Sequence, residues 1–289
     1  MGSVVVGYSG GVDSTLLLSV AHEQLGDKAI AVTAVSPSLP REELEQAIRM
    51  AQEIGAQHLL IDSEEVHDPD YIANSPDRCY YCKLLRFDEL LRIARRRNFT
   101  YVVDGCNRDE LKDHRPGIRA ARELGVRSPL VEAGLTKAEI RALSRKLGLP
   151  TWDKPSAACL ASRIPYGTPI TEERLTQIDE AERFLHSLGI AQVRVRHHGD
   201  IARIEVEAES LPLLLESRSQ VVNRLHELGF AYVTADLKGY RSGSMNETLG
   251  EEKDGKDIAQ PDFSYFERFD RRLRADAFSE RKLEPTDFG

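Results

Sequence analysis

The sequence lacks several features that would assign the protein to a familiar class. No apolar run approaches the roughly 18 residues that a membrane-spanning helix needs, and the N-terminus shows no basic stretch followed by an apolar core and a cleavage site. Only four of the 289 residues are cysteines, too few and too irregularly placed for a disulfide scaffold. These absences predict a cytoplasmic protein without a membrane partner, and they leave the cysteines for metal or redox chemistry.

The chain also lacks an excess of basic residues. Its 39 lysines and arginines are outnumbered by 47 aspartates and glutamates, which gives a formal net charge of −8. A chain of this charge repels the phosphate backbone of nucleic acids, although a local basic groove can exist within an acidic whole. The composition therefore predicts no nucleic-acid partner.

Residues 9–14 form a glycine-containing segment between a predicted strand and a predicted helix. They read Ser-Gly-Gly-Val-Asp-Ser. Glycine lets the backbone approach a ligand closely, and the free N–H groups at the start of a helix favour an anion. The spacing matches neither the Walker loop nor the Gly-x-Gly-x-x-Gly dinucleotide motif, and a plain strand-to-helix turn is the alternative interpretation. The residues expected to bind phosphate are Ser9, Gly10, Gly11, Asp13 and Ser14.

Asp13 is the one acidic residue of this segment. Its carboxylate is suited to position either magnesium or the ammonium group of a lysine.

The first half of the chain alternates short apolar runs with helical patterns. We predict strands at 4–8, 29–35, 58–61, 101–103 and 128–131, and helices at 14–25, 42–54, 83–97, 116–124 and 137–147. This alternation predicts an α/β fold in which helices cover both faces of a parallel sheet. Ligands of such sheets bind beyond the carboxyl ends of the strands, which is where the segment 9–14 lies.

We predict four parts along the chain. They are a nucleotide-binding domain at 1–150, a proline-rich linker at 151–170, a smaller α+β domain at 171–249 and a charged tail at 250–289. In the smaller domain we expect helices at 172–188 and 211–228 and strands at 193–196, 202–207 and 231–235. The composition of the tail suits either a helix that docks on a partner subunit or a partly disordered segment.

Three of the four cysteines form a candidate metal or redox site. Cys79 and Cys82 lie just before a predicted helix among basic residues, which favour thiolate over thiol. Cys159 lies in the linker, which we expect to close over the nucleotide site. Three thiolates can bind three irons of a 4Fe-4S cluster and leave the fourth iron open, whereas a structural zinc site needs a fourth ligand. Cys106 or a histidine would supply that ligand, although Cys106 fits better as a pocket residue.

Two arginines alternate along a predicted strand. Because side chains two residues apart share one face of a strand, Arg194 and Arg196 point the same way and suit a phosphate group. Glu205 is placed to orient them, or to bind magnesium together with Asp200. The alternative is a strand face that simply contacts solvent.

Four segments carry a resemblance to a known family. They are the loop at 9–14, Asp-Gly-Cys-Asn at 104–107, the linker stretch 154–167, and the strand segments at 193–196 and 200–205. The loop alone resembles that of the ATP pyrophosphatases, which cleave ATP between its α and β phosphates. Together the segments resemble the LarE family, whose members are ATP-dependent sulfur transferases that build the nickel-pincer cofactor of lactate racemase. The similarity covers residues 3 to about 249.

The resemblance implies a Rossmann-like fold of the adenine-nucleotide alpha-hydrolase type, with ATP and Mg2+ as cofactors. The implied substrate is pyridinium-3,5-biscarboxylic acid mononucleotide, whose carboxylates become thiocarboxylates. A carboxylate is a poor electrophile, so ATP adenylates it before sulfur attacks. Family members take that sulfur either from one sacrificed linker cysteine or from a 4Fe-4S cluster.

The resemblance also assigns residues and an assembly. Cys79, Cys82 and Cys159 place the chain in the cluster type, with the sulfide donor left open. The residues implied to bind the phosphate of the substrate are Ser162, Arg163, Arg194, Arg196 and Glu205. Family members form homo-oligomers, hexamers among them, so we expect the same here.

Other functions fit some of these features. A tRNA thiolase also pairs a pyrophosphate loop with three cysteines, but it usually carries basic RNA-binding modules that this sequence lacks. An amide-forming synthetase would use the acyl adenylate and leave the cysteines without a role. A nucleotide-binding sensor would hold the cluster and catalyse no reaction.

Overall fold

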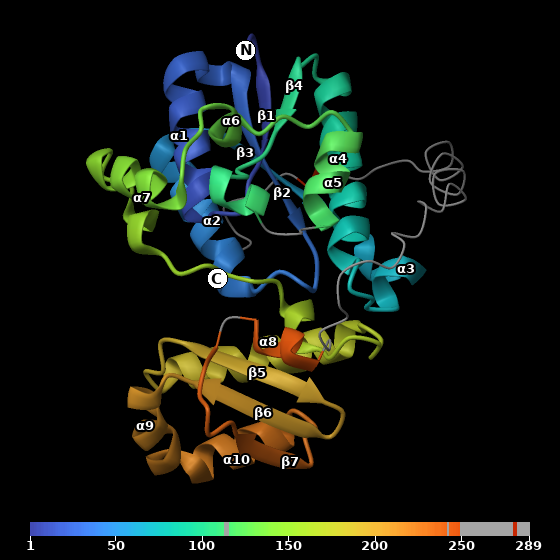
Figure 1. The fold of residues 1–289 in the computed structure, drawn as a ribbon, viewed down its shortest axis with the longest axis vertical. Helices are drawn as coiled ribbons and strands as arrows, with labels where there is room; N and C mark the ends of the chain where they lie inside the picture. Colours follow the sequence, from blue (N-terminus) through green and yellow to red (C-terminus); the bar gives the residue numbers. More distant parts are fainter. Residues whose placement is uncertain (113–115, 242, 249–279, 282–289) are drawn as a thin grey trace.

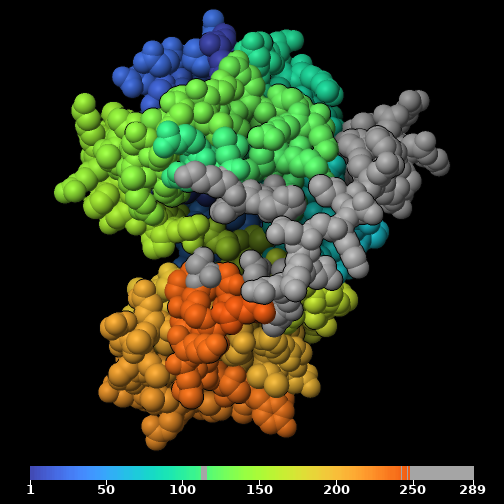
Figure 2. Space-filling model, in the orientation of Figure 1, coloured from blue at the N-terminus to red at the C-terminus, as the bar shows by residue number. Residues whose placement is uncertain are grey.

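The protein is described by a computed structural model that covers residues 1–112, 116–241, 243–248 and 280–281. It has two units, each built on its own sheet and stacked along the long axis of the molecule (Figure 1). Figure 2 shows the two units meeting at a narrow waist. Within the described ranges, no helix is both long enough and apolar enough to cross a membrane.

The first sheet has the strand order β4-β1-β2-β3-β8. Its strands are β1 (Val4–Gly7), β2 (Ala29–Val35), β3 (Gln57–Asp62), β4 (Tyr101–Val103) and β8 (Glu280–Arg281). The strands β1 to β4 pair in parallel, and β8 adds to β3 in the antiparallel direction. The strand order changes direction between β1 and β4, and crevices at such switch points bind ligands in open α/β sheets. The loop that follows β1 therefore begins at this switch point.

Helices cover both faces of this sheet, as the sequence predicts. They are α1 (Val12–Leu25), α2 (Arg41–Ile54), α4 (Arg78–Arg96), α5 (Pro116–Glu123), α6 (Pro129–Glu132) and α7 (Lys137–Lys146), whereas the short helix α3 (Pro69–Ile72) packs against linker residues instead. Val4 and Val6 of β1 pack with α1, α2 and α7, whereas Val5 packs with α4 and α5 on the opposite face. Because β1 is buried on both faces, its sequence is continuously apolar rather than alternating.

The second unit is a smaller α+β structure. Its strands are β5 (Val193–His198), β6 (Ile201–Val206) and β7 (Tyr232–Ala235), and its helices are α8 (Glu172–Ser187), α9 (Leu211–Glu216) and α10 (Arg218–Glu227). The strands β5 and β6 form an antiparallel hairpin, and β7 pairs in parallel with β6. Between the two units, the linker contains single turns of 3-10 helix at Pro150–Asp153 and Leu160–Arg163.

The structure corrects three sequence predictions. Residues 128–131 were expected to form a strand, but Pro129 instead begins the short helix α6, and the chain meets the sheet only through a bridge between Val103 and Arg127. The helix expected at 211–228 is two helices that meet at Ser217. The helix expected from residue 83 begins at Arg78 and so includes two of the cysteines. Apart from residues 280–281, the charged tail lies outside the described residues.

His58 on β3 is a buried base whose protonation opposes folding. Burial lowers the pKa of His58 from 6.5 to about 4. The Thr33 hydroxyl donates to the carbonyl of Tyr8, so it accepts from Nε2 of His58 at 2.8 Å, and Nδ1 of the same ring is buried without a hydrogen-bond partner among the described residues. A second ring proton would therefore have no acceptor.

We expect acid to destabilise the protein through His58. The unfolded chain binds a proton near pH 6.5 that the folded protein does not bind until about pH 4, so the free energy of unfolding falls as the pH drops through this window, by up to about 3 kcal/mol. Urea unfolding at pH 7 and pH 4.5 should show a smaller difference for His58→Gln than for the parent. The exposed His67 provides the control, and an equal change in His67→Gln would contradict the assignment.

Candidate functional site

The loop between β1 and α1 has the geometry of an anion site. No side chain caps the N-terminus of α1 at Gly11, so the first N–H groups of the helix are available to a ligand. Gly10 has a φ of 68°, and a Cβ there would lie 2.7 Å from the Cβ of Ala47 on α2. The Ser9 and Ser14 hydroxyls lie 3.1 Å apart and turn towards each other across the loop. Glycine at position 10 is therefore a steric requirement of this loop.

Two lysines that the sequence analysis did not identify reach the loop. Lys137, the first residue of α7, forms an ion pair with Asp13, and Asn107 donates to the same carboxylate at 3.3 Å. Lys154 of the linker donates to the carbonyl of Gly10 at 3.2 Å. The sequence offered magnesium or a lysine as the partner of Asp13, and the described residues provide the lysine. Lys137 belongs to none of the quoted segments and Lys154 begins the linker stretch 154–167, and both lie more than 100 residues from the loop in the sequence.

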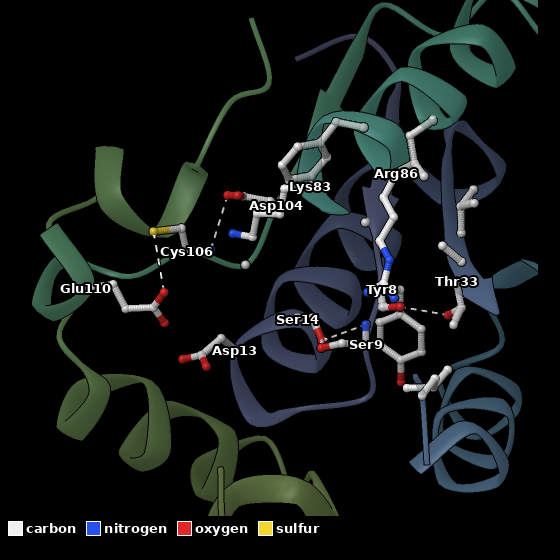
Figure 3. A pocket seen from close by; sticks show the side chains of 17 residues that line it. Tyr8, Ser9, Asp13, Ser14, Thr33, Lys83, Arg86, Asp104, Cys106 and Glu110 are labelled. Atoms are coloured by element: carbon white, nitrogen blue, oxygen red, sulfur yellow. Dashed lines mark hydrogen bonds between the residues drawn. The ribbon is translucent and has the colours of Figure 1, made fainter. Parts of the chain in front are cut away.

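A cavity of about 290 Å³ opens beside the loop (Figure 3). Its polar wall includes Ser9, Asp13 and Ser14, and apolar residues of β2 and α4 line the other side. Gly105 closes it from the end of β4, where a Cβ would lie 2.9 Å from the backbone nitrogen of Ser14. Cys106 is buried at the edge, where its thiol donates to Glu110 at 3.8 Å, as expected for a pocket residue. Apolar walls next to phosphate donors suit a nucleoside triphosphate.

Two further cavities continue from this one towards the second unit. A cavity of about 220 Å³ shares Ser9, Asp13 and Arg86 with the first and is walled by linker residues that include Cys159. A cavity of about 310 Å³ shares the linker residues 154–158 with the second and ends at Arg163 and Arg194. The three cavities thus adjoin in series, with the linker between the nucleotide loop and the arginines.

The three candidate cysteines converge beside the middle cavity. Cys79 and Cys82 lie at the start of α4, and Cys159 precedes the second 3-10 turn of the linker. A negative charge on Cys159 raises the pKa of both other thiols, and one on Cys79 raises that of Cys82, so the three groups lie within electrostatic reach of one another. Among the described residues, no three or more His, Cys, Asp or Glu side chains are grouped to hold a single metal ion.

The expectation of thiolates at this place is wrong for two of the cysteines. Burial raises the pKa of Cys82 to about 12, and the nearby Arg86 offsets only part of this effect. The pKa of Cys79 is also raised, by partial loss of hydration of its thiol and then by the charge of Cys159, although the residue as a whole is exposed and has three basic neighbours. The sequence shows the flanking cations but not the loss of hydration, which is the larger effect here.

A buried tyrosine hydroxyl lies against the same group. Tyr71 on α3 is 1% exposed and packs in an apolar cluster with Cys82 and Cys159. Its hydroxyl lies near Ser38, yet no hydrogen bond of acceptable geometry reaches it within the described part of the chain. Burial raises the pKa of Tyr71, as do negative charges on Cys159 and Cys82. A buried donor without an acceptor, beside two thiols, suits a sulfur-containing group bound between them.

The predicted phosphate-binding residues fall into two sets. Arg194 lines the third cavity, where its guanidinium lies 5.4 Å from the ring centre of Tyr240, and its pKa is lowered by burial and then by the like charge of Arg163. Arg163 also borders this cavity, with both ends of its guanidinium bound to Glu182 at 2.9 and 3.0 Å. It donates as well to the backbone carbonyl of Cys159 at 3.0 Å, which ties the linker to the second unit.

The second set lies behind the cavity wall. Arg196 is 5% exposed and donates to Glu205 at 2.7 and 3.0 Å, to Ser244 at 2.9 Å and to the carbonyl of Ser162 at 3.2 Å. Glu205 is fully buried and also accepts from Arg203 at 3.0 Å. Glu205 thus orients Arg196 and Arg203, whereas the sequence predicted that it orients Arg194 and Arg196, and Asp200 is exposed.

Comparisons with known proteins agree with this architecture. Residues 3–150 match the family described as the arginosuccinate synthase N-terminal HUP domain. Over 247 residues the chain is 42% identical to pyridinium-3,5-bisthiocarboxylic acid mononucleotide synthase of Lactiplantibacillus plantarum, an alignment that covers 85% of this chain and 90% of that protein. It is 49% identical over the same length to an uncharacterized protein of Synechocystis sp., covering 85% and 92% of the two chains. A tRNA-specific 2-thiouridylase of Rickettsia peacockii is 27% identical over 193 residues, about half of each chain.

Proposed function

The chain belongs to the LarE family of ATP-dependent sulfurtransferases, and from this premise we propose that it makes pyridinium-3,5-bisthiocarboxylic acid mononucleotide. The substrate is pyridinium-3,5-biscarboxylic acid mononucleotide. ATP with Mg2+ adenylates each carboxylate and releases pyrophosphate into the loop at 9–14. Sulfur then displaces AMP.

The order of the three cavities carries this proposal. Adenylation joins the nucleotide to the substrate carboxylate, so both must reach one point, and sulfur must arrive at that same point. Cys159 lines the middle cavity, which adjoins the nucleotide cavity on one side and the arginine cavity on the other. A mononucleotide whose phosphate binds at Arg194 would extend its ring towards Cys159 and the nucleotide.

Cys79, Cys82 and Cys159 are the proposed ligands of a 4Fe-4S cluster. Cys82 and Cys159 pack in one apolar cluster, and a charge on Cys159 raises the pKa of both Cys79 and Cys82, which supports a shared centre in which each thiol binds a different iron. The buried side chain of Tyr71, which packs with Cys82 and Cys159, supports a sulfur-containing group at the same place. When bound, such a cluster supplies sulfide as the nucleophile. Arg163 holds the linker carbonyl at Cys159 and so positions this ligand.

An anaerobic assay with three products tests the proposal. Reconstituted protein is incubated with ATP and the biscarboxylated pyridinium mononucleotide, and AMP, pyrophosphate and thiocarboxylate are measured together. All three should form, with AMP and pyrophosphate in equal amounts. AMP formation that requires tRNA would favour a tRNA thiolase instead, and an amide product with added ammonia would favour a synthetase. A homo-oligomer, such as a hexamer, and a cytoplasmic location remain predictions.

Arginine substitutions should separate binding from folding. We expect Arg194→Ala to weaken substrate binding roughly tenfold to a hundredfold, since a charged hydrogen bond to phosphate is lost, while ATP binding and thermal stability change little. Arg196→Ala should instead lower stability, because removing one partner of a buried ion pair costs about 3–5 kcal/mol, although Arg203 still faces Glu205. Calorimetry with substrate and with ATP, together with thermal denaturation, measures both effects.

The surface variant Arg183→Ala, on α8, serves as the control for these substitutions. Equal losses of ATP and substrate affinity in Arg194→Ala would count against the phosphate role.

A further inference from the structure

Arg86 lies where the nucleotide cavity meets the cavity of the cysteines. It follows Cys82 by one turn of α4, and its side chain lines both cavities. Figure 3 shows it extending from α4 towards Tyr8 and Ser9 of the phosphate loop. Its position therefore brings a positive charge between the phosphate donors of the loop and the thiol of Cys82, whose pKa it lowers in part against burial.

A buried carboxylate fixes the orientation of this guanidinium. Glu65 is 0% exposed and accepts from Arg86 Nη2 at 2.7 Å. It also accepts hydrogen bonds from Ser36 at 2.6 Å, from Ser38 at 3.0 Å and from Ser63. Burial alone would raise the pKa of Glu65, but Arg86 and the serine hydroxyls together hold it below the usual value, so this carboxylate stays ionised. A charged carboxylate with four donors leaves the guanidinium little freedom to turn.

One N–H group of this guanidinium lacks an acceptor. Nε of Arg86 is buried and has no hydrogen-bond partner within the described part of the protein. A buried N–H without an acceptor costs about 1–3 kcal/mol. The surrounding structure keeps Arg86 in this orientation at a junction of two cavities, where its side chain is 27% exposed and can meet a ligand oxygen.

We propose that Arg86 is a catalytic residue that binds the α-phosphate of the nucleotide. This inference rests on the proposed function, because it takes the acyl adenylate to form at the cavity junction. In the second step the sulfur forms a bond to the acyl carbon, the bond between that carbon and the phosphate oxygen breaks, and its electron pair leaves with AMP. The α-phosphate carries one negative charge in the acyl adenylate and two in AMP. Arg86 stabilises the charge that develops there and offsets the repulsion between this phosphate and an incoming anionic sulfur.

A comparison of AMP with adenosine tests the assignment, because the two ligands differ only in the phosphate. We expect Arg86→Gln to weaken AMP binding roughly tenfold to a hundredfold and to change adenosine binding less than about twofold. Arg86→Lys should lose part of the AMP affinity, since lysine keeps the charge but not the planar fork. Isothermal titration calorimetry on the full chain, without substrate, gives the dissociation constants of AMP and adenosine for the parent and for both variants.

Arg92 on the same helix provides the matched control. It pairs with Asp88 at 2.9 Å and Glu89 at 3.1 Å and lines neither cavity, so Arg92→Gln should bind AMP and adenosine as the parent does. Equal losses for AMP and adenosine in Arg86→Gln, or unchanged AMP affinity, would overturn the proposal. Circular dichroism checks that each variant is folded. Glu65→Gln is a second variant that retains Arg86, and it should weaken the binding of AMP but not the binding of adenosine.

These outcomes are separate from the failure of the proposed function. AMP binding requires neither the mononucleotide substrate nor a cluster, so Arg86 can be assigned even if the protein thiolates another carboxylate. Conversely, Arg86→Gln that forms thiocarboxylate at the parental rate would remove Arg86 from the mechanism and leave the sulfur-transfer function intact.

Discussion

Alanine at position 79, 82 or 159 is expected to abolish both the brown absorbance of the reconstituted protein and its sulfur transfer. Each iron of a 4Fe-4S cluster needs a terminal ligand, so the loss of one thiol leaves two irons without a protein ligand instead of one. The three cysteines lie on α4 and in the linker, outside the proposed phosphate loop, so ATP affinity should stay within about twofold of the parent. Visible absorbance, iron content and acid-labile sulfide measure the first effect, and calorimetry with ATP measures the second.

The fourth cysteine is the matched control for this series. Cys106 is buried at the far side of the nucleotide cavity, hydrogen-bonded towards Asn107 and Glu110, so Cys106→Ala should retain the cluster absorbance. Retention of iron in all three single variants would refute the ligand assignment. Turnover that converts Cys159 to dehydroalanine, detected by mass spectrometry as the loss of hydrogen sulfide, would mean that the linker cysteine itself supplies the sulfur.

Gly10→Ala is expected to reduce ATP affinity by at least about a hundredfold. A Cβ at this position would lie 2.7 Å from the Cβ and 2.8 Å from the Cα of Ala47, which is itself buried in the core between α2 and the sheet. Helix α2 cannot retreat without disturbing that core, so the loop must move instead, and several charge-assisted hydrogen bonds to phosphate are lost with it. Calorimetry with ATP and with pyrophosphate should show parallel losses.

A second glycine separates the steric effect from backbone strain. Gly125 has a φ of 70°, close to that of Gly10, but no atom lies within 4 Å of a Cβ built there. Gly125→Ala should therefore cost about 1 kcal/mol of stability, from the left-handed conformation alone, and leave ATP binding intact. If Gly10→Ala resembled Gly125→Ala in both measurements, the close packing of the loop against Ala47 would not matter for phosphate binding.

Local sequence patterns predict much of the fold and part of the candidate site. The apolar run at 4–8, the glycines of the loop and the helical pattern after it predict a phosphate site at a strand end, and the structure has that strand, that loop and α1 in place. The period of two along Val193–His198 predicts a strand that carries two arginines. These features depend on neighbours a few residues apart, which the sequence displays directly. The prediction of a strand at 128–131 is wrong, because Pro129 begins the short helix α6 at this place.

Contacts between distant segments were decided by the tertiary structure. Three such contacts join residues from separate helices or loops. They are the ion pair of Asp13 with Lys137, the proximity of Cys159 to Cys82 on α4, and the ion pair of Glu65 with Arg86. The same holds for the difference between Arg194, which faces a cavity, and Arg196, which is buried against Glu205. Because Arg194 and Arg196 lie two residues apart on the same strand, the sequence pattern does not distinguish their surroundings.

From the sequence alone follow the class of fold, the candidate phosphate loop and the candidate cluster cysteines, since each prediction depends on residue type and local spacing. The raised pKa of Cys82, the serial order of the cavities and the cation shared between them follow only from the folded chain. The physical reason is that hydration and electrostatic interaction depend on distances in space, and packing sets those distances between residues that the sequence keeps far apart.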